Sequence, residues 1–238
     1  MYLRESNRVS PEALDTYTTP PSTWSYSPIS HSDARLQTLL SLDMQGHTVA
    51  SEEVTVNPSG TKAVGMFKID NGIDGYNPML IWINSTDKSQ AFRAIVGMLR
   101  LICTNGMVAG HAVYRSREIH RGNIHAKVER VARQASQAVN GEIESHQRRI
   151  EVYKNRLIDF KSAEASHCLV RAFDENIIST RQLAGVRREM LTPTHEEYND
   201  GSCYGLYNCF THVLRGQGSD GIGKTLKLTS LFDKATGN

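Results

Sequence analysis

The most basic part of the sequence lies between residues 114 and 133. Only Glu118 and Glu129 oppose its six cations, which are Arg115, Arg117, Arg121, Lys127, Arg130 and Arg133. Guanidinium and ammonium groups neutralise phosphates, so this composition predicts salt-sensitive and largely sequence-independent nucleic-acid binding. Tyr114 begins the run and would supply a stacking platform for a base. The same composition also fits a helix that faces solvent or another subunit, and both interpretations stay open.

A phosphate-loop pattern occurs near the end of the sequence, where residues 218–225 read GSDGIGKT and match G-x-x-x-x-G-K-[ST]. Such a loop works because its backbone N–H groups wrap phosphates at the start of a helix. Only 13 residues follow Thr225, which leaves no room for later strands or for an acidic Mg²⁺ partner. We therefore expect a flexible hairpin loop, from which Lys224 and Lys227 contact phosphates of a nucleic acid. A nucleotide-dependent enzyme is the least favoured functional hypothesis.

The cysteines and histidines of the C-terminal part are poorly spaced for metal binding. The candidates are His195, Cys203, Cys209 and His212. They include no C-x-x-C pair, so we expect no metal site. Cys103 follows an apolar run and is expected to be a packed thiol rather than a nucleophile. The sequence therefore predicts no catalytic residue and no cofactor.

Charge is distributed unevenly along the 238 residues, although the net charge is only +2. Residues 1–80 carry a net −4, residues 81–190 a net +7 and residues 191–238 a net −1. The middle part is therefore the part that would face an anionic partner. No run of 18 apolar residues occurs, and the N-terminus has no apolar segment typical of a secretory signal. We expect a cytoplasmic protein of a bacterial host cell, with reduced cysteines and no membrane contact.

Five segments are expected to form the framework that positions these residues. Residues 1–32 are polar and proline-containing, which predicts an extended N-terminal arm. A short helix follows from Asp33, with its apolar face formed by Leu36, Leu39 and Leu40. Alternating residues predict a strand, a turn and a strand over 49–69, followed by strands over 79–83 and 107–114.

Residues 84–106 read NSTDKSQAFRAIVGMLRLICTNG and predict a turn followed by a helix over 87–103. Asp87 and Gln90 resemble a capping box at its start. The residues of its core-facing stripe recur at helical spacing, and they are Phe92, Ile95, Val96, Leu99 and Ile102. Asn105 and Gly106 tolerate the left-handed conformation that ends a helix.

The second half of the sequence is predicted to be mainly helical, with a helical insertion at about 116–190. Its first part is one long helix, or two helices broken at Asn140-Gly141. A helix over 204–214 and a strand-like tail complete the chain.

The 84–106 run resembles a phage- and plasmid-associated family of unknown function. The residues that carry the resemblance are Asn84, Ser85, Asp87, Ser89, Arg93, Arg100, Cys103, Asn105 and Gly106, with GLYNCFTHVLRG at 205–216. The similarity extends over roughly residues 50–232. The resemblance implies a protein of bacteriophages, prophages or plasmids. The sequence is also distantly similar to ring-forming single-strand annealing proteins. The family resemblance implies a structural role for the motif, and no catalytic residue.

Together these patterns predict an α+β fold, with a small, mainly antiparallel sheet packed against one central helix. After the arm, residues 33–238 would form a single domain. The leading functional hypothesis is a non-catalytic phage or prophage protein that binds single-stranded DNA in annealing or recombination and forms homo-oligomers. The alternative is a protein-interaction module that inhibits a host defence system or host enzyme. Whether the anionic partner is DNA, RNA or a protein stays open.

Overall fold

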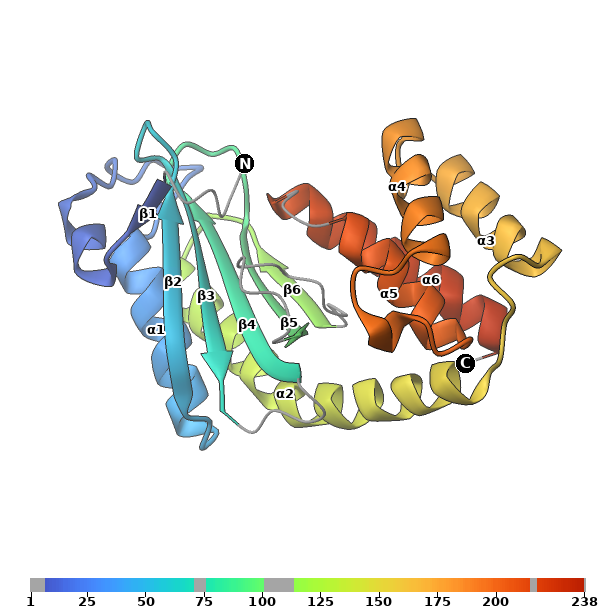
Figure 1. Ribbon diagram of the computed structural model, residues 1–238. Helices are drawn as coiled ribbons and strands as arrows, with labels where there is room; N and C mark the ends of the chain where they lie inside the picture. Colours follow the sequence, from blue (N-terminus) through green and yellow to red (C-terminus); the bar gives the residue numbers. More distant parts are fainter. Residues whose placement is uncertain (1–6, 71–75, 101–113, 215–217, 238) are drawn as a thin grey trace. The chain divides into compact units, whose positions relative to one another are not determined.

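The computed structural model describes residues 7–70, 76–100, 114–214 and 218–237. It is an α+β protein, as predicted, with a six-stranded antiparallel sheet and several helices (Figure 1). The chain divides into two compact units, and the division falls within one long helix between Ile143 and Glu144. This division differs from the single domain expected for residues 33–238. The first unit contains the sheet, and the second is helical.

The sheet of the first unit is a meander, in which each strand is antiparallel to the next along the chain. Its strands are β1 (Arg8–Val9), β2 (Val49–Val56), β3 (Lys62–Ile69), β4 (Tyr76–Ser85), β5 (Phe92–Arg100) and β6 (Tyr114–Glu118). The predicted strands over 49–69 and 79–83 are confirmed. Of the strand predicted over 107–114, only Tyr114 lies within the described residues.

The turn between β2 and β3 shows why this hairpin was predictable. Gly60 has a φ of +69°, which favours glycine. The side-chain Oδ1 of Asn57 accepts hydrogen bonds from the backbone N–H groups of Thr61 (2.9 Å) and Lys62 (2.8 Å). Local hydrogen bonds from a side chain to the backbone fix a tight turn. The geometry of that turn then sets the register of the two strands.

The central helix predicted over 87–103 is wrong, because residues 92–100 form β5, which lies between β4 and the edge strand β6. Phe92, Ala94 and Val96 point to one face and are fully buried, while Ile95 on the other face is 6% exposed. A strand buried on both faces shows no alternation, so its apolar residues also match helical spacing by chance. The β-branched pair Ile95-Val96 favours the strand, and Gly97 is unfavourable in the interior of a helix. Cys103, Asn105 and Gly106 lie outside the described residues.

One face of the sheet is covered by α1 (His31–Met44) and by the first part of α2 (Ile124–Asn155) (Figure 1). The side chain of Ser30 caps α1 by accepting a hydrogen bond from Asp33 N (2.9 Å). The buried face of α1 differs in part from the prediction, since Leu39 packs against the core whereas Leu36 and Leu40 do not. Its core residues include Ala34 and Leu42, and its exposed large apolar residues are Leu36, Leu40 and Met44.

The N-terminal segment is packed rather than a free extended arm. It contributes β1 to the sheet and a 3₁₀-helix η2 (Pro11–Thr16). Leu14 and Ile29 are each 1% exposed and belong to the core of the sheet. Because two large apolar side chains are buried here, this segment contributes to the stability of the first unit.

The long helix α2 continues through Asn140-Gly141, which settles the choice between one helix and two. The other helices are α3 (Ala163–Asp174), α4 (Thr180–Leu191), the 3₁₀-helix η3 (Glu196–Tyr198), α5 (Cys203–Val213) and α6 (Gly218–Thr236). The helical region and the helix predicted over 204–214 are therefore confirmed. The flexible loop and strand-like tail are wrong, since residues 218–236 form α6.

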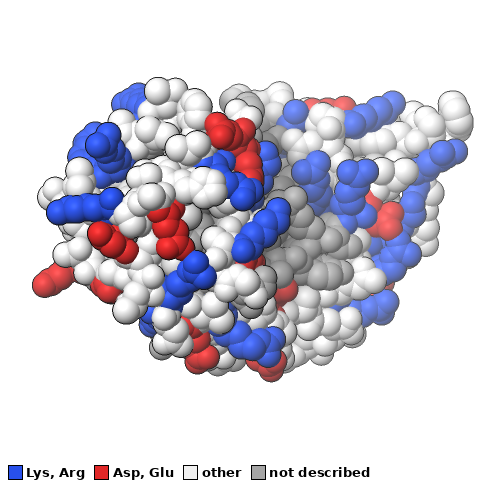
Figure 2. All heavy atoms as spheres, turned by 90° about the vertical axis from the view of Figure 1, so that its right-hand side faces the viewer, with Lys and Arg blue, Asp and Glu red and all other residues white. Residues whose placement is uncertain are grey.

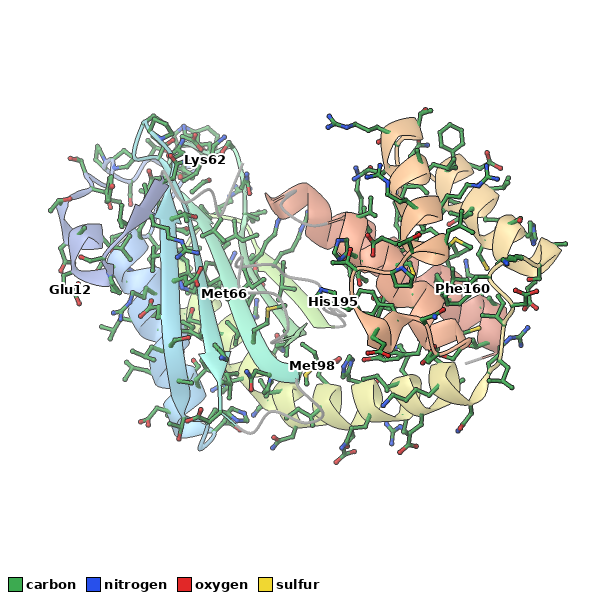
Figure 3. The ribbon with its side chains drawn as sticks, viewed as in Figure 1. Glu12, Lys62, Met66, Met98, Phe160 and His195 are labelled. Carbon is green, nitrogen blue, oxygen red and sulfur yellow. The ribbon has the colours of Figure 1, made fainter. Side chains whose placement is uncertain are left out.

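The core of the second unit combines aromatic packing with a buried polar network. Residues 203–211 of α5 are all buried, so this helix is the centre of the unit. Asp233 Oδ1 accepts hydrogen bonds from Tyr153 OH (2.7 Å) and Arg149 Nε (2.9 Å). His195, labelled in Figure 3, packs edge-on against Tyr198, with their ring centroids 5.0 Å apart. Hydrogen bonds with a defined geometry specify one packing of these helices.

Gly65 on β3 gives a test of the sheet core. A Cβ at this position would overlap the indole ring of Trp82 on β4. We expect Gly65→Ala to lower the free energy of unfolding of the first unit by about 1 to 3 kcal/mol, because the buried indole cannot move without disturbing its neighbours. Urea denaturation, followed by the fluorescence of the buried Trp82, measures the change.

Gly141→Ala is the matched control, because no heavy atom lies within 4 Å of its added Cβ. Alanine is the better helix former, so this variant should be more stable than the wild type by up to about 1 kcal/mol. A Gly65→Ala protein with wild-type stability would contradict the close packing of Trp82 on β3.

Candidate nucleic-acid interface

The basic residues at 115–133 do not form one continuous surface. Strand alternation in β6 places Glu118 on the face of the sheet that α2 covers, and Arg117 on the opposite face. On the α2 side, Glu118 forms an ion pair with Lys127 (3.7 Å) and a close ion pair with Arg130. Two of the predicted phosphate ligands are therefore already engaged by a carboxylate.

The other predicted ligands are dispersed. Arg133 pairs with Glu129 one helical turn away on α2 (3.9 Å). Lys224 and Lys227 belong to α6 of the second unit, where Lys227 Nζ donates a hydrogen bond to the carbonyl oxygen of Glu175 (3.4 Å). The side chains of Tyr114, Arg115 and Arg100 lie outside the described residues. Of the predicted cations, only Arg117 and Arg121 have described side chains that line one pocket.

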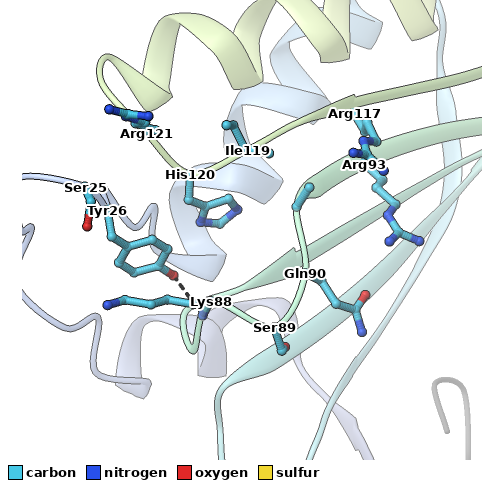
Figure 4. A pocket seen from close by; sticks show the side chains of 11 residues that line it. Ser25, Tyr26, Lys88, Ser89, Gln90, Arg93, Arg117, Ile119, His120 and Arg121 are labelled. Atoms are coloured by element: carbon cyan, nitrogen blue, oxygen red, sulfur yellow. Dashed lines mark hydrogen bonds between the residues drawn. The ribbon is translucent and has the colours of Figure 1, made fainter.

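That pocket has a volume of about 520 Å³ and is bounded entirely by residues of the first unit (Figure 4). Its cations are Lys88, Arg93, Arg117 and Arg121. None of its 11 lining residues is an Asp or a Glu. On the face of the molecule in Figure 2, by contrast, acidic and basic side chains are interspersed over much of the described surface. The pocket is therefore a local concentration of positive charge.

Arg93 and Arg117 contribute two of the four cations from the sheet. They lie directly opposite each other on β5 and β6, and their side chains project on the same side of the sheet (Figure 4). Like charges on directly opposed residues destabilise a pair of strands. Within the described residues, neither guanidinium forms an ion pair or a hydrogen bond. An anion placed between the two would remove the repulsion.

The turn between β4 and β5 delivers the third cation, and it is built by the Asn84–Gln90 motif. Asn84 is fully buried and its Nδ2 donates to the carbonyl oxygen of Ile29 (3.0 Å). Ser85 Oγ accepts from Gln90 N (3.0 Å) and donates to Gln90 O (2.9 Å). Asp87 accepts from Thr61 Oγ1 and from Ser89 N, each at 3.0 Å. These bonds confirm the predicted turn and exclude the predicted helix start.

Lys88, at the tip of this turn, has a φ of +65°, which is unfavourable for a residue with a side chain. This conformation costs on the order of 1 kcal/mol, so the hydrogen bonds on either side of Lys88 must hold it. The result is that Lys88 Nζ lies over the ring of Tyr26, 5.2 Å from its centroid. The turn thus fixes a cation at the rim of the pocket.

Tyr26 and His120 form the aromatic wall of the pocket. Their rings are stacked, with centroids 5.7 Å apart and an angle of 8° between the planes. His120 is 5% exposed, and neither of its ring nitrogens has a hydrogen-bond partner within the described residues. Burial, with a smaller contribution from His31, lowers the pKa of His120 to about 4. His120 is therefore neutral at pH 7, and the cations of the pocket are its lysine and arginines.

The remaining sequence candidates do not form a site. Residues 218–225 lie within α6, so the phosphate-loop pattern does not form a loop that could wrap phosphates. No group of three His, Cys, Asp or Glu with the geometry of a metal site occurs among the described residues. Burial raises the pKa of Cys203 to about 11 and of Cys209 to about 12, as expected for packed thiols.

Three features of the pocket were missed by sequence reasoning, namely Lys88, Tyr26 and His120. The signal that points to Lys88 is the NSTDKSQ turn, which presents one cation among residues that bond to each other. Tyr26 lies in the segment that was expected to be an extended arm. Arg93 was included in the 84–106 motif, for which the family resemblance implied a structural role.

Fold and pocket together define an α+β protein with a cationic pocket on the side of a meander sheet opposite to α1 and α2. The chain belongs to the family described as Domain of unknown function (DUF932), whose model matches residues 33–221. No solved structure matches the chain. Among the described residues, no helix is long and apolar enough to cross a membrane.

The burial of His120 predicts a loss of stability in acid. The unfolded chain takes up a proton near pH 6.5, whereas the folded protein does so only near pH 4. The contribution of His120 to stability is therefore complete above pH 6.5 and is lost as the pH falls toward 4. Between pH 7.5 and 5 we expect a loss of about 2 kcal/mol from this residue, and His120→Phe should not show it.

Urea denaturation at each pH, followed by Trp82 fluorescence, measures this loss in both proteins. An NMR titration of the wild type gives an independent check. A His120 resonance with a midpoint near 6.5 would show that the ring is not buried as described.

Proposed function

We propose that the protein is a non-catalytic nucleic-acid-binding protein of a phage or prophage, which holds single-stranded DNA in annealing or recombination. The observation that carries the proposal is the pocket in which four cations meet without a carboxylate. Backbone phosphates of DNA pass through this pocket, and Arg93 and Arg117 contact them from the sheet. The phage setting rests on the resemblance of residues 84–106 to phage- and plasmid-associated proteins.

Phosphate is the ligand that best satisfies the Arg93–Arg117 pair. A guanidinium presents a planar fork of N–H donors that bonds two phosphate oxygens at once, and charge-assisted bonds of this kind are strong. Two opposed guanidiniums can grip one phosphate or two successive phosphates. Binding then removes the repulsion between them, so the cost of placing them opposite each other is recovered when DNA is bound.

The pocket reads the backbone rather than the bases. The ring of Tyr26 is stacked on His120 and also lies under Lys88, so it is already engaged by its own neighbours. Contacts to phosphate position a nucleic acid but carry no sequence information. We therefore infer sequence-independent binding, as an annealing protein requires. Lys127, Arg130 and Arg133 contribute more weakly in this proposal, because each already has a carboxylate partner.

Homo-oligomerisation is part of the proposal, since annealing requires several protein copies along one strand. Light scattering with and without single-stranded DNA measures the assembly. An increase in particle mass on addition of DNA would support cooperative assembly.

Charge reversal at the pocket tests the binding site. We expect Arg93→Glu and Arg117→Glu to weaken binding of an oligothymidine strand by more than about tenfold at low salt. Each substitution replaces a hydrogen-bond donor to phosphate with a carboxylate that repels it. Both variants should also reduce the dependence of affinity on salt, because fewer counterions are released. Fluorescence anisotropy at two salt concentrations measures both quantities.

Arg133→Glu is the matched control, since it makes the same change of charge at a cation of α2 that is half exposed and lies outside the pocket. It should weaken binding much less than the pocket variants. Equal losses for all three variants would show that net charge, and not the pocket, determines binding. No binding of the wild type at low salt would refute the proposed function.

A protein-interaction module that inhibits a host defence system or host enzyme is the second candidate. The observation that favours it is an apolar row on α1, where Leu36, Leu40 and Met44 are 47%, 50% and 77% exposed. They recur every four residues and therefore share one side of the helix. A host partner that is lost in Leu40→Glu and retained in Arg117→Glu, without DNA binding, would favour this function.

A further inference from the structure

Trp24 is the most exposed of the large apolar side chains described, with 91% of its surface accessible. The sequence contains one other tryptophan, Trp82, which is fully buried in the sheet. Leaving an indole in water forgoes the burial of one of the largest apolar surfaces that a side chain offers. An indole that is exposed beside a binding pocket is therefore a candidate for contact with the ligand.

The backbone around Trp24 is fixed next to the cationic pocket. Thr23 and Tyr26 form an antiparallel bridge, in which Thr23 N donates to Tyr26 O at 2.7 Å. Trp24 and Ser25 are therefore the two residues at the tip of a tight turn. Trp24 is followed by Ser25 and Tyr26, and both of these residues line the pocket.

A second bond ties this turn to the segment that carries His120, because Ser27 N donates to the carbonyl oxygen of His120 (3.0 Å). The stacking of Tyr26 on His120 joins the same two segments through their side chains. The indole is thus presented by a rigid turn, while the side chain itself stays open to solvent. Because the backbone of the turn is already held, only the side-chain torsions of Trp24 remain to be ordered when a ligand stacks on it.

We propose that Trp24 is a stacking platform for an unpaired base of the DNA whose phosphates occupy the pocket. This inference rests on the proposed function and adds base contact to it. Stacking on an indole accepts any base, so it does not conflict with sequence-independent binding. It requires a base that is free to leave its neighbours, and therefore makes the site selective for single strands over duplexes.

The two tryptophans give separate fluorescence signals, which makes the proposal testable in the full chain. A base stacked on Trp24 should quench its emission, whereas Trp82 is shielded in the core. We expect an oligothymidine strand to quench the wild-type protein and to leave Trp24→Phe almost unquenched. An abasic strand with the same number of phosphates should not quench either protein.

Affinities complete the test. Trp24→Ala should bind the oligothymidine strand about tenfold more weakly than the wild type, and should bind the abasic strand with the wild-type affinity. Trp24→Phe should retain part of the preference for bases, because a smaller ring still stacks. Leu40→Ala removes another exposed apolar side chain from the first unit and should change neither affinity.

The outcomes separate this inference from the function on which it rests. If Trp24→Ala keeps the wild-type preference for the oligothymidine strand, Trp24 is not a stacking platform, while the loss of binding in Arg117→Glu would still support the phosphate pocket. If the wild type binds neither strand at low salt, both proposals are refuted. A wild type that binds duplex DNA as tightly as single strands would also overturn the role of Trp24.

Discussion

Side-chain alternation on β5 and β6 is the constraint on which the cationic pocket depends. On one side of these strands, Phe92, Ala94 and Val96 are buried with the apolar residues of α2, and Glu118 pairs with two cations of the same helix. The neighbouring positions must then project to the other side, where Arg93 and Arg117 meet. The apolar core and the ion pairs of α2 thus hold the two arginines opposite each other, although like charges repel.

The Asn84–Gln90 turn connects this strand pair to the N-terminal segment. Its buried amide bonds to the carbonyl oxygen of Ile29, and its backbone holds Lys88 in an unfavourable conformation above Tyr26. Backbone strain of this kind persists only where the surrounding bonds enforce it, and it is often found at functional sites. The turn therefore has a structural role, as the sequence indicated, but what it positions is a cation of the pocket.

Elements with a clear local signal were predictable from the sequence, and elements whose pattern fits more than one structure were not. The hairpin at 49–69 has an Asn-Pro-Ser-Gly turn, and the helical region after residue 116 has a long apolar stripe, although the stripe left open whether the helix continues through Asn140-Gly141. In β5, residues 94–98 are buried on whichever face of the sheet they lie, so this part of the strand is apolar without alternation and also matches a helix. In α6, the pattern Gly218–Thr225 suggested a loop, whereas tertiary packing of Thr225, Leu228 and Phe232 selects a helix.

The pocket could be predicted only in part, because its residues come from positions 25 to 121 and meet only through the folding of the sheet. A count of charges along the chain gives all the cations between 115 and 133 equal weight. Folding makes these cations unequal in their ability to bind phosphate. An arginine paired with a carboxylate must break or share that ion pair to bind phosphate, whereas two opposed arginines are stabilised by an anion placed between them. If the pocket binds phosphate as proposed, the cations that matter most are those that the fold leaves without a carboxylate, and the local sequence does not single out Arg93 and Arg117 among them.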